Sequence, residues 1–300
     1  MPEYRNSVII MLLILIIFNS AFAQQQRGRA FTVPDINIER AEKMVDVGGR
    51  KLHCFAYGKG SPSVILVSGF NGPQETWNAV VPALAEMTTV VTYDRAGYGK
   101  SEIGGLPAHG IQSAKDLKIL LEELNVPKPY VLVGHSYGER VVSFFTSMYP
   151  ENMGGLIILD GQHPDILDEQ RKVLKGRDLE RLNQMTSMMR TPQNPKTEAD
   201  YMFITLEQAK KIGNMPQIPY FVVTSGSNRE GGIPPGFSDE GREKLVELGI
   251  EVQKKLVDRI PGGKHIILDD VSHYMQLEKP KPVIKIITDM VETVKKEINK

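Results

Sequence analysis

The chain has 300 residues, of which 41% are hydrophobic and 24% are charged, a composition ordinary for a globular protein with a large core. Lysine plus arginine and aspartate plus glutamate both total 36, so the net charge is zero. This balance argues against a nucleic-acid partner, which favours a basic excess. Cys54 is the only cysteine, which excludes a disulfide within the chain, and its alternating apolar surroundings predict a buried strand thiol.

The N-terminal segment predicts a secretory signal peptide. A short polar head with Arg5 precedes an apolar run from Val8 to Phe18, and Ala21 to Ala23 form a small-x-small cleavage site. The apolar run is shorter than the roughly 20 residues of a membrane span. We therefore expect residues 1–23 to be removed and the protein to be secreted or periplasmic, without stable membrane insertion. The alternative is an uncleaved N-terminal anchor.

From Met44 onward, strand-like runs alternate with amphipathic helices. Short apolar, β-branched runs predict buried strands, and apolar side chains spaced three and four residues apart predict helices. The predicted strands lie within residues 63–70, 88–93, 130–134, 154–161, 219–226 and 264–270, and the predicted helices within 75–87, 114–124, 139–150 and 283–298. This order predicts an α/β fold with a mostly parallel central sheet and helices on both faces. Ligands of such sheets bind at the carboxyl ends of the strands.

The segment from residue 162 to residue 215 breaks this alternation. It is polar, helix-like and too long for a simple crossover, so it predicts a small helical lid inserted after the strand that ends at Asp160. The core then comprises residues 44–161 and 216–300, preceded by an arm at 24–43. The methionines of the lid either line an adaptable pocket or bury the lid against the core; they are Met185, Met188, Met189 and Met202.

The stretch GHSYG, residues 134–138, matches the G-x-S-x-G pattern between a predicted strand and a predicted helix. In that context the serine occupies a strained turn that requires small neighbours two residues away on either side, and Gly134 and Gly138 meet this requirement. The turn raises the hydroxyl above the sheet, next to the N–H groups at the start of the helix. Ser136 is therefore the expected nucleophile, and a simple Gly-Ser turn is the alternative.

A serine hydroxyl needs a base and an acid. His273 follows the last predicted strand, which is the position expected for the base in the order Ser, acid, His. Asp160 and Glu230 compete for the role of the acid. Asp160 is favoured, because a carboxylate at the end of an apolar strand is costly without a partner, whereas Glu230 looks solvated. The side chain of His135 is expected to point away from Ser136.

The mechanism also needs donors for an oxyanion. The backbone N–H of Tyr137 is one candidate. The backbone N–H of Phe70, in the loop SGFNG after an earlier strand, is the other, and Gly69 and Gly72 would allow the backbone to approach closely. The sequence has no cluster of cysteine or histidine residues that suggests a metal or a cofactor.

From about Met44 to Lys300 the chain resembles an α/β-hydrolase of the group around esterases, epoxide hydrolases and haloalkane dehalogenases. The motifs that carry the resemblance are VSGF, YDRAGYGKS, GHSYG, IILDG and SHYMQLEKP. Two positions depart from the usual pattern. Ser68 replaces the usual histidine and is expected to alter the pocket wall, and the acid stands one strand earlier than in many relatives, as in some dehalogenases. Dehalogenases and epoxide hydrolases of this group use an aspartate nucleophile, so a serine argues against both chemistries.

These features predict a serine hydrolase that acts on a small-molecule acyl substrate, an ester or else an amide or a thioester, through an acyl-enzyme. Acyl transfer, perhydrolysis and C–C bond hydrolysis would use the same three residues and remain alternatives. A protein that binds a ligand without turning it over is the alternative outside enzyme chemistry.

Overall fold

The computed structural model describes residues 40–190, 197–213, 215–226, 233 and 235–299. The predicted signal peptide therefore lies outside the described residues, together with most of the predicted arm. The first strand begins at Arg40, so the last four residues of the expected arm, 40–43, belong to the sheet.

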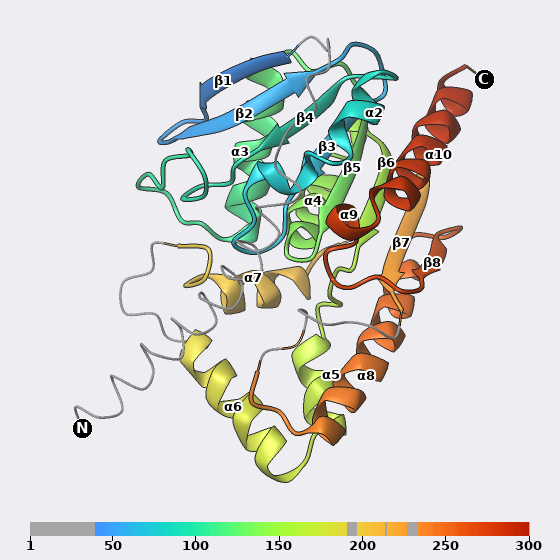
Figure 1. Ribbon diagram of the computed structural model, residues 1–300. Helices are drawn as coiled ribbons and strands as arrows, with labels where there is room; N and C mark the ends of the chain where they lie inside the picture. Colours follow the sequence, from blue (N-terminus) through green and yellow to red (C-terminus); the bar gives the residue numbers. More distant parts are fainter. Residues whose placement is uncertain (1–39, 191–196, 214, 227–232, 234, 300) are drawn as a thin grey trace.

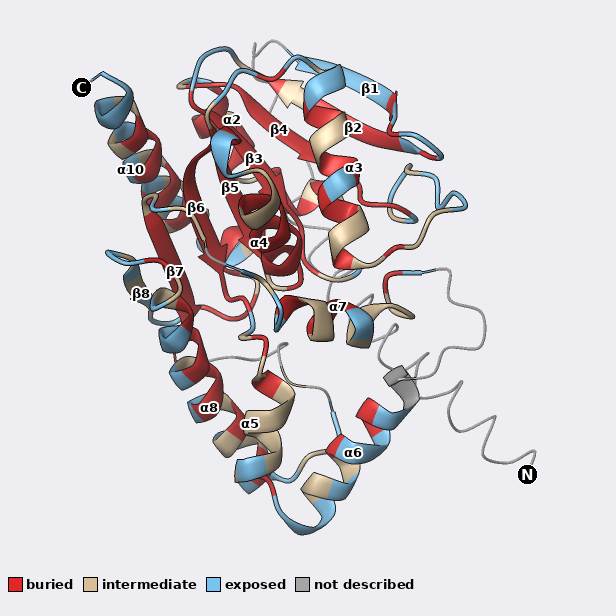
Figure 2. Ribbon diagram, turned by 180° about the vertical axis from the view of Figure 1, so that it is seen from behind, coloured by how far each residue is buried: buried red, intermediate tan, exposed pale blue. Residues whose placement is uncertain are grey.

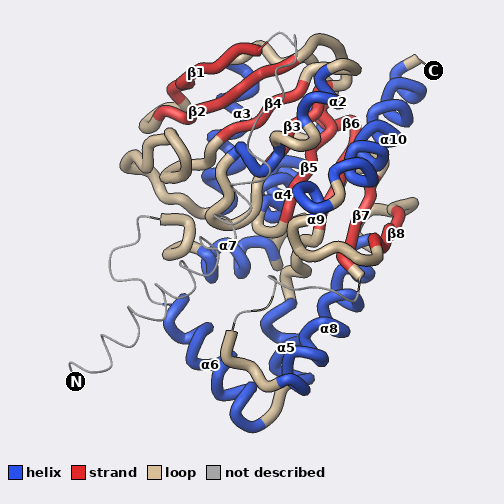
Figure 3. The backbone as a smooth tube through the Cα atoms, viewed as in Figure 1, coloured by secondary structure: helices blue, strands red, loops and turns tan. Residues whose placement is uncertain are grey.

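One sheet of eight strands runs through the described part of the chain (Figures 1 and 3). The strands are β1 (Arg40–Asp46), β2 (Lys51–Tyr57), β3 (Ser63–Val67), β4 (Val90–Tyr93), β5 (Tyr130–His135), β6 (Met153–Leu159), β7 (Tyr220–Ser225) and β8 (Lys264–Leu268). Their order across the sheet is β1-β2-β4-β3-β5-β6-β7-β8. β1 and β2 pair antiparallel with their neighbours, and all pairings from β4 to β8 are parallel. The predicted mostly parallel sheet is confirmed.

Helices cover both faces of this sheet. The α-helices are α2 (Val81–Ala85), α3 (Gly110–Glu123), α4 (Gly138–Met148), α5 (Ile166–Val173), α6 (Gly176–Arg190), α7 (Met202–Ala209), α8 (Asp239–Val257), α9 (Met275–Glu278) and α10 (Pro280–Ile298). The described residues also form two short 3₁₀-helices, η1 (Gln74–Trp77) and η2 (Pro150–Asn152). Figure 1 shows α5, α6 and α7 together at the end of the sheet where β5 and β6 finish.

The strands divide their side chains between two cores. Tyr130 and Leu132 of β5 pack with α3 and α4 on one face, and Val131 and Val133 pack with α2 and α10 on the other. This alternation follows from the two-residue period of a strand. Because both faces are covered, β3 to β7 contain only buried residues, as the red strands of Figure 2 show. Parallel strands of this kind read as continuous apolar runs rather than as alternating ones.

The path of the chain places two important loops beside each other. After β3 the chain moves outward to β4, and it then returns to the opposite side of β3 to form β5. The strand order therefore reverses between β3 and β5, which are neighbours with their carboxyl ends at one edge. A reversal of this kind opens a crevice where α/β sheets bind ligands. The loop that contains Phe70 and the turn that contains Ser136 meet there.

The close approach of α4 to β3 yields a prediction about stability. A Cβ atom on Gly138 would lie 2.4 Å from the carbonyl oxygen of Val67 and 2.8 Å from that of Ser68. These are backbone atoms of the sheet and its adjoining loop, so Gly138→Ala is expected to lower the free energy of unfolding by about 1–3 kcal/mol, the usual range for overpacking. Unfolding in urea, followed by circular dichroism, measures this change.

Gly105→Ala is the matched control, because Gly105 is exposed and a Cβ atom there would meet nothing within 4 Å. Its free energy of unfolding should stay within about 1 kcal/mol of the wild-type value. Equal losses in both variants would contradict the packing that we describe.

Candidate active site

Ser136 occupies the tight turn between β5 and α4. Its φ angle is 52°, in the left-handed region that non-glycine residues seldom adopt. The turn is secured by the hydrogen bond from the Ser136 N–H to the carbonyl oxygen of Leu159, at 2.9 Å. Gly134 is required beneath it, because a Cβ atom there would lie 2.8 Å from the backbone nitrogen of Glu139. The geometry matches the strained strand-to-helix turn expected from the sequence.

Three predicted site residues form one chain of hydrogen bonds. Nε2 of His273 lies 2.9 Å from the Oγ of Ser136, and Nδ1 of His273 lies 2.6 Å from Oδ2 of Asp160. His273 belongs to the loop between β8 and α9, and its side chain is largely buried. Asp160 is completely buried at the end of β6. Glu230, the competing candidate for the acid, lies outside the described residues.

The carboxylate of Asp160 receives a second set of hydrogen bonds, which sequence reasoning missed. Its Oδ1 accepts a hydrogen bond from the Nε2 of Gln253, at 2.8 Å, and one from the backbone N–H of Ser225, at 3.2 Å. Gln253 is fully buried on α8 and in turn accepts a bond from the hydroxyl of Thr224, at 2.9 Å. His265 continues the chain, with its Nε2 2.7 Å from the Thr224 oxygen. These donors hold the buried carboxylate in one orientation and stabilise its charge.

His135 supports the loop that contains His273 through a hydrogen bond. Its Nε2 donates a hydrogen bond to the backbone carbonyl of His273, at 2.7 Å. Burial, above all, lowers the pKa of His135 to about 3, and the neighbouring His273 ring acts in the same direction. The ring therefore stays neutral, and the accepting carbonyl places its proton on Nε2. The sequence did not predict this role for His135, because its only distinguishing feature there is that it occupies the first variable position of the G-x-S-x-G pattern.

The two predicted oxyanion donors come from the loop after β3, which contains Phe70, and from the start of α4, which contains Tyr137. Tyr137 is the N-cap residue of α4, so its backbone N–H has no partner inside that helix. Among the described residues, neither this N–H nor that of Phe70 donates a hydrogen bond. Phe70, Ser136 and Tyr137 line the same cavity. The two N–H groups are therefore available to a ligand atom near the Ser136 hydroxyl.

Arg95 fixes the loop that contains Phe70. Its guanidinium donates to the carbonyl oxygens of Ser68 and Gly69, at 2.5 and 2.8 Å, and forms a buried ion pair with Glu198, at 2.6 Å. Glu198 precedes α7, so this ion pair ties the inserted segment to the sheet. The Ser68 hydroxyl lies 3.0 Å from the Thr76 hydroxyl and does not reach the cavity. Ser68, which stands where relatives usually carry a histidine, therefore supplies no side chain to the described wall of this cavity.

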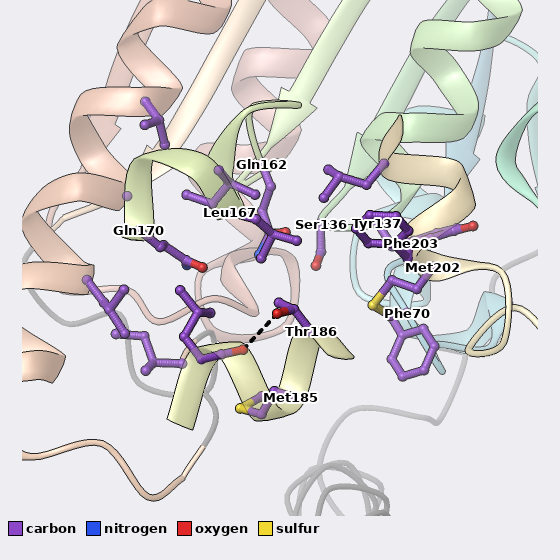
Figure 4. Close-up of a pocket in the computed structure, with 18 of the residues that line it drawn as sticks. Phe70, Ser136, Tyr137, Gln162, Leu167, Gln170, Met185, Thr186, Met202 and Phe203 are labelled. Atoms are coloured by element: carbon purple, nitrogen blue, oxygen red, sulfur yellow. Dashed lines mark hydrogen bonds between the residues drawn. The ribbon is translucent and has the colours of Figure 1, made fainter. Parts of the chain in front are cut away.

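The hydroxyl of Ser136 opens into a cavity of about 240 Å³ (Figure 4). Its described lining is mostly apolar, and most of it comes from α5, α6, α7 and α8; it includes Leu167, Leu182, Met185, Met202, Phe203, Leu206 and Leu245. The polar side chains in this lining are those of Ser136, Tyr137, Arg140, Gln162, Gln170 and Thr186. An apolar cleft with a few convergent polar groups is the usual form of a small-molecule site.

The inserted segment builds much of this cavity but not all of it. Met185 and Met202 line it, which agrees with the first of the two interpretations of the lid methionines. The side chains of Met188 and Met189 lie outside the described part. Leu245 and Val252 of α8, in the predicted core, form another wall. Across the described ranges, no group of three or more histidine, cysteine, aspartate or glutamate side chains could hold a metal ion. No helix in the described residues is long and apolar enough to cross a membrane.

The buried imidazole of His135 makes stability depend on pH. Its pKa is about 3 in the folded protein and about 6.5 in the unfolded chain. The unfolded chain therefore binds the extra proton first, and the folded state loses stability as the pH falls below 6.5, by up to about 1.4 kcal/mol per pH unit. Between pH 7 and pH 4.5, the wild-type free energy of unfolding should fall about 2.5 kcal/mol further than that of His135→Gln.

Glutamine suits this comparison because its amide can still donate to the His273 carbonyl but does not titrate. Chemical denaturation of both proteins at a series of pH values provides the measurement. Parallel stability curves would show that His135 does not carry this pH dependence.

Comparisons with known proteins agree with this architecture. A family model described as the alpha/beta hydrolase fold matches residues 62–224, more than half of the chain. The uncharacterised protein YqjL of Bacillus subtilis is 26% identical over 191 residues, which cover 63% of this chain and 72% of YqjL. A fluoroacetate dehalogenase of a Burkholderia species is 34% identical over 123 residues, 39% of this chain and 40% of the dehalogenase. The chain thus matches less than half of that relative's length.

A solved structure extends the similarity over most of the chain. The malate-bound form of a thermophilic esterase from Thermogutta terrifontis superposes with a TM-score of 0.60 at 20% identity, covering 85% of this chain and 99% of the esterase. At this identity the likeness concerns the fold. Together with the family model, it confirms the predicted fold and agrees with the prediction of a hydrolase. The chain therefore belongs to the alpha/beta hydrolase family.

Proposed function

We propose that the protein is a serine hydrolase that cleaves a small carboxylic ester through an acyl-enzyme intermediate. The observation that carries this proposal is the hydrogen-bond chain from Ser136 through His273 to Asp160, at 2.9 and 2.6 Å, at the edge of an apolar cavity. A serine hydroxyl becomes an effective nucleophile when a histidine within hydrogen-bond reach accepts its proton. The chain supplies this base and a buried carboxylate that orients it.

In the proposed reaction Ser136 Oγ attacks the ester carbonyl while Nε2 of His273 takes the hydroxyl proton. The new C–O bond gives a tetrahedral oxyanion, which the backbone N–H groups of Phe70 and Tyr137 stabilise. His273 then gives its proton to the leaving alcohol as the ester C–O bond breaks. Water, with His273 as its base, attacks the acyl-enzyme and releases the acid, which regenerates Ser136.

Asp160 has two tasks in this scheme. Its Oδ2 accepts the Nδ1–H of His273, which leaves Nε2 facing Ser136 as the proton acceptor. Its negative charge also stabilises the imidazolium that forms after proton transfer. The donors on Oδ1, Gln253 and the N–H of Ser225, keep the carboxylate from rotating. The carboxylate of the proposed acid is therefore already ordered beside His273, which lowers the entropic cost of reaching the reactive geometry.

The remaining proposals concern the surroundings of the site. We propose that residues 162–215 act as a lid, supported by the share of the cavity wall that α5, α6 and α7 supply. We also propose a secreted or periplasmic enzyme that acts on a small-molecule acyl substrate. The predicted signal peptide, which supports that location, can be tested by N-terminal sequencing of protein isolated from the native host.

A fluorophosphonate probe tests the nucleophile directly. The mature protein should gain one adduct, on Ser136, because the probe requires an activated serine. Ser136→Ala should gain none, and labelling of His273→Ala should be slower by a factor of about 10³ or more, since the base is removed. Intact mass and peptide mapping measure the adduct. A folded protein that binds esters without labelling or turnover would instead favour the ligand-binding alternative.

A pair of variants tests the acid. Asp160→Asn should lower kcat on a reactive ester by about 10⁴, because an amide cannot stabilise the imidazolium and favours the wrong tautomer of His273. Glu230→Gln, the matched control, should change kcat less than about threefold, because Asp160 and not Glu230 is the proposed acid. Steady-state kinetics on 4-nitrophenyl butanoate measure both effects. Activity lost only in Glu230→Gln would transfer the role of the acid to Glu230.

A further inference from the structure

The cavity that Ser136 faces contains a buried cation that the proposed reaction does not use. Arg140 lies in the first turn of α4, four residues after Ser136, and only 5% of its surface is exposed. Among the described lining residues it is the only one with a charged side chain. A cation in the first turn of a helix opposes the helix dipole. The fold therefore keeps Arg140 at a position where stability alone would not favour it.

Part of the Arg140 guanidinium is used and part is free. Its Nη1 donates to Oε2 of Glu139, at 3.1 Å, and to the backbone carbonyl of Gln162, at 2.8 Å. Within the described part of the chain, Nε and Nη2 of Arg140 have no hydrogen-bond partner. Both atoms nevertheless keep some accessible surface. Because almost all of Arg140 is covered by protein and the residue lines the cavity, these nitrogens are placed to meet a molecule inside it.

The local charges do not cancel. Glu139 is shared between two cations, since its Oε1 also lies 3.3 Å from Nη1 of Arg259. One carboxylate thus faces two guanidinium groups, which leaves an excess of one positive charge. The effect of burial outweighs Glu139 and lowers the pKa of Arg140, as expected for a cation with incomplete compensation. An anion in the cavity would supply the missing charge, and a buried guanidinium suits a carboxylate with its paired N–H donors.

Two amides lie on the same side of the cavity. Figure 4 shows Gln162 and Gln170 near the space in front of Ser136, on the side opposite Phe70, Met202 and Phe203. Amide N–H groups can donate hydrogen bonds to the lone pairs of a carboxylate that the guanidinium leaves unused. The labelled side chains opposite the amides are mostly apolar, whereas the amides lie on either side of Leu167. Arg140, which donates to the carbonyl of Gln162, adds the one cation of the described lining. A ligand that fills it would be apolar along part of its length and anionic at one end.

We propose that Arg140 determines specificity by binding a carboxylate on the part of the ester that occupies this cavity. This inference rests on the proposed ester hydrolysis and names its substrate class, esters with a free carboxylate. Arg140 takes no part in proton transfer. It positions the substrate by a charge-assisted hydrogen bond, which is worth about 1.5–3 kcal/mol, or roughly a 10- to 100-fold preference in kcat/KM.

The experiment compares substrates that differ only in the anionic group. In the acyl arm, kcat/KM is measured for 4-nitrophenyl hemiglutarate and for its carboxamide analogue. In the alcohol arm, the pair is 4-carboxyphenyl butanoate and 4-carbamoylphenyl butanoate. The wild type should prefer the carboxylate at least 10-fold in one arm, which also identifies the part of the ester that the cavity holds. The ratio is taken within one protein sample, so the folded fraction cancels.

Variants assign the preference to Arg140. Arg140→Gln should reduce the ratio to within about twofold of unity, and Arg140→Lys should restore part of it, because lysine keeps the charge but not the paired donors. Arg171→Gln is the control, since Arg171 is an arginine of α5 that does not line this cavity, and it should keep the wild-type ratio. A wild type without preference in either arm, or a preference that survives in Arg140→Gln, would overturn the inference. Failure to cleave any of the four esters, with Ser136 unlabelled by fluorophosphonate, would count against the proposed hydrolase itself.

Discussion

The left-handed backbone of Ser136 is the constraint on which the rest of the site depends. A serine at φ 52° is held there only because its surroundings leave no alternative. Gly134 and Gly138 let α4 approach the ends of β3 and β5 closely enough to fix the turn, and a side chain on either would strike backbone atoms. The turn directs the hydroxyl toward the cavity and presents the first N–H of α4 beside it. One strained residue therefore places both the candidate nucleophile and one candidate oxyanion donor.

Around this turn, buried polar groups make the hydrogen bonds that water would make to the same side chains in a solvated site. Asp160 would be costly at the end of an apolar strand without partners, and it is stabilised by His273 on one oxygen and by Gln253 and Ser225 on the other. The Nε2 of His135 donates a hydrogen bond to the His273 backbone carbonyl and so fixes its loop. Such a network is rigid because the loss of any one bond would leave a buried group unsatisfied. The geometry that the proposed reaction needs is thus present before a substrate arrives.

Arg95 connects this rigid centre to the segment between β6 and β7, which supplies part of the cavity wall. Arg95 binds the loop of Phe70 and Glu198 at once, so the position of the inserted segment and the position of a candidate oxyanion donor are mechanically linked. A buried pair of this kind contributes little net stability but strongly penalises the loss of either partner. Arg140, by contrast, is incompletely compensated and faces the cavity. Arg95 therefore has a structural role, whereas Arg140, as we propose, selects the substrate.

The sequence by itself determined the order of strands β3 to β8 and of helices α3, α4 and α10, together with the turn at Ser136 and the loop of His273. These features depend on local spacing and on residues that tolerate strained backbone, whereas α8, which carries Gln253, was not predicted. The sequence also favoured Asp160 through the cost of burying a charge. The contacts of Gln253, His135 and Arg140 were decided only by the tertiary structure. Gln253 lies 93 residues from Asp160, and neither its type nor its spacing signals the contact. Hydrogen bonds act over about 3 Å, so partners from distant segments become visible only when the chain has folded.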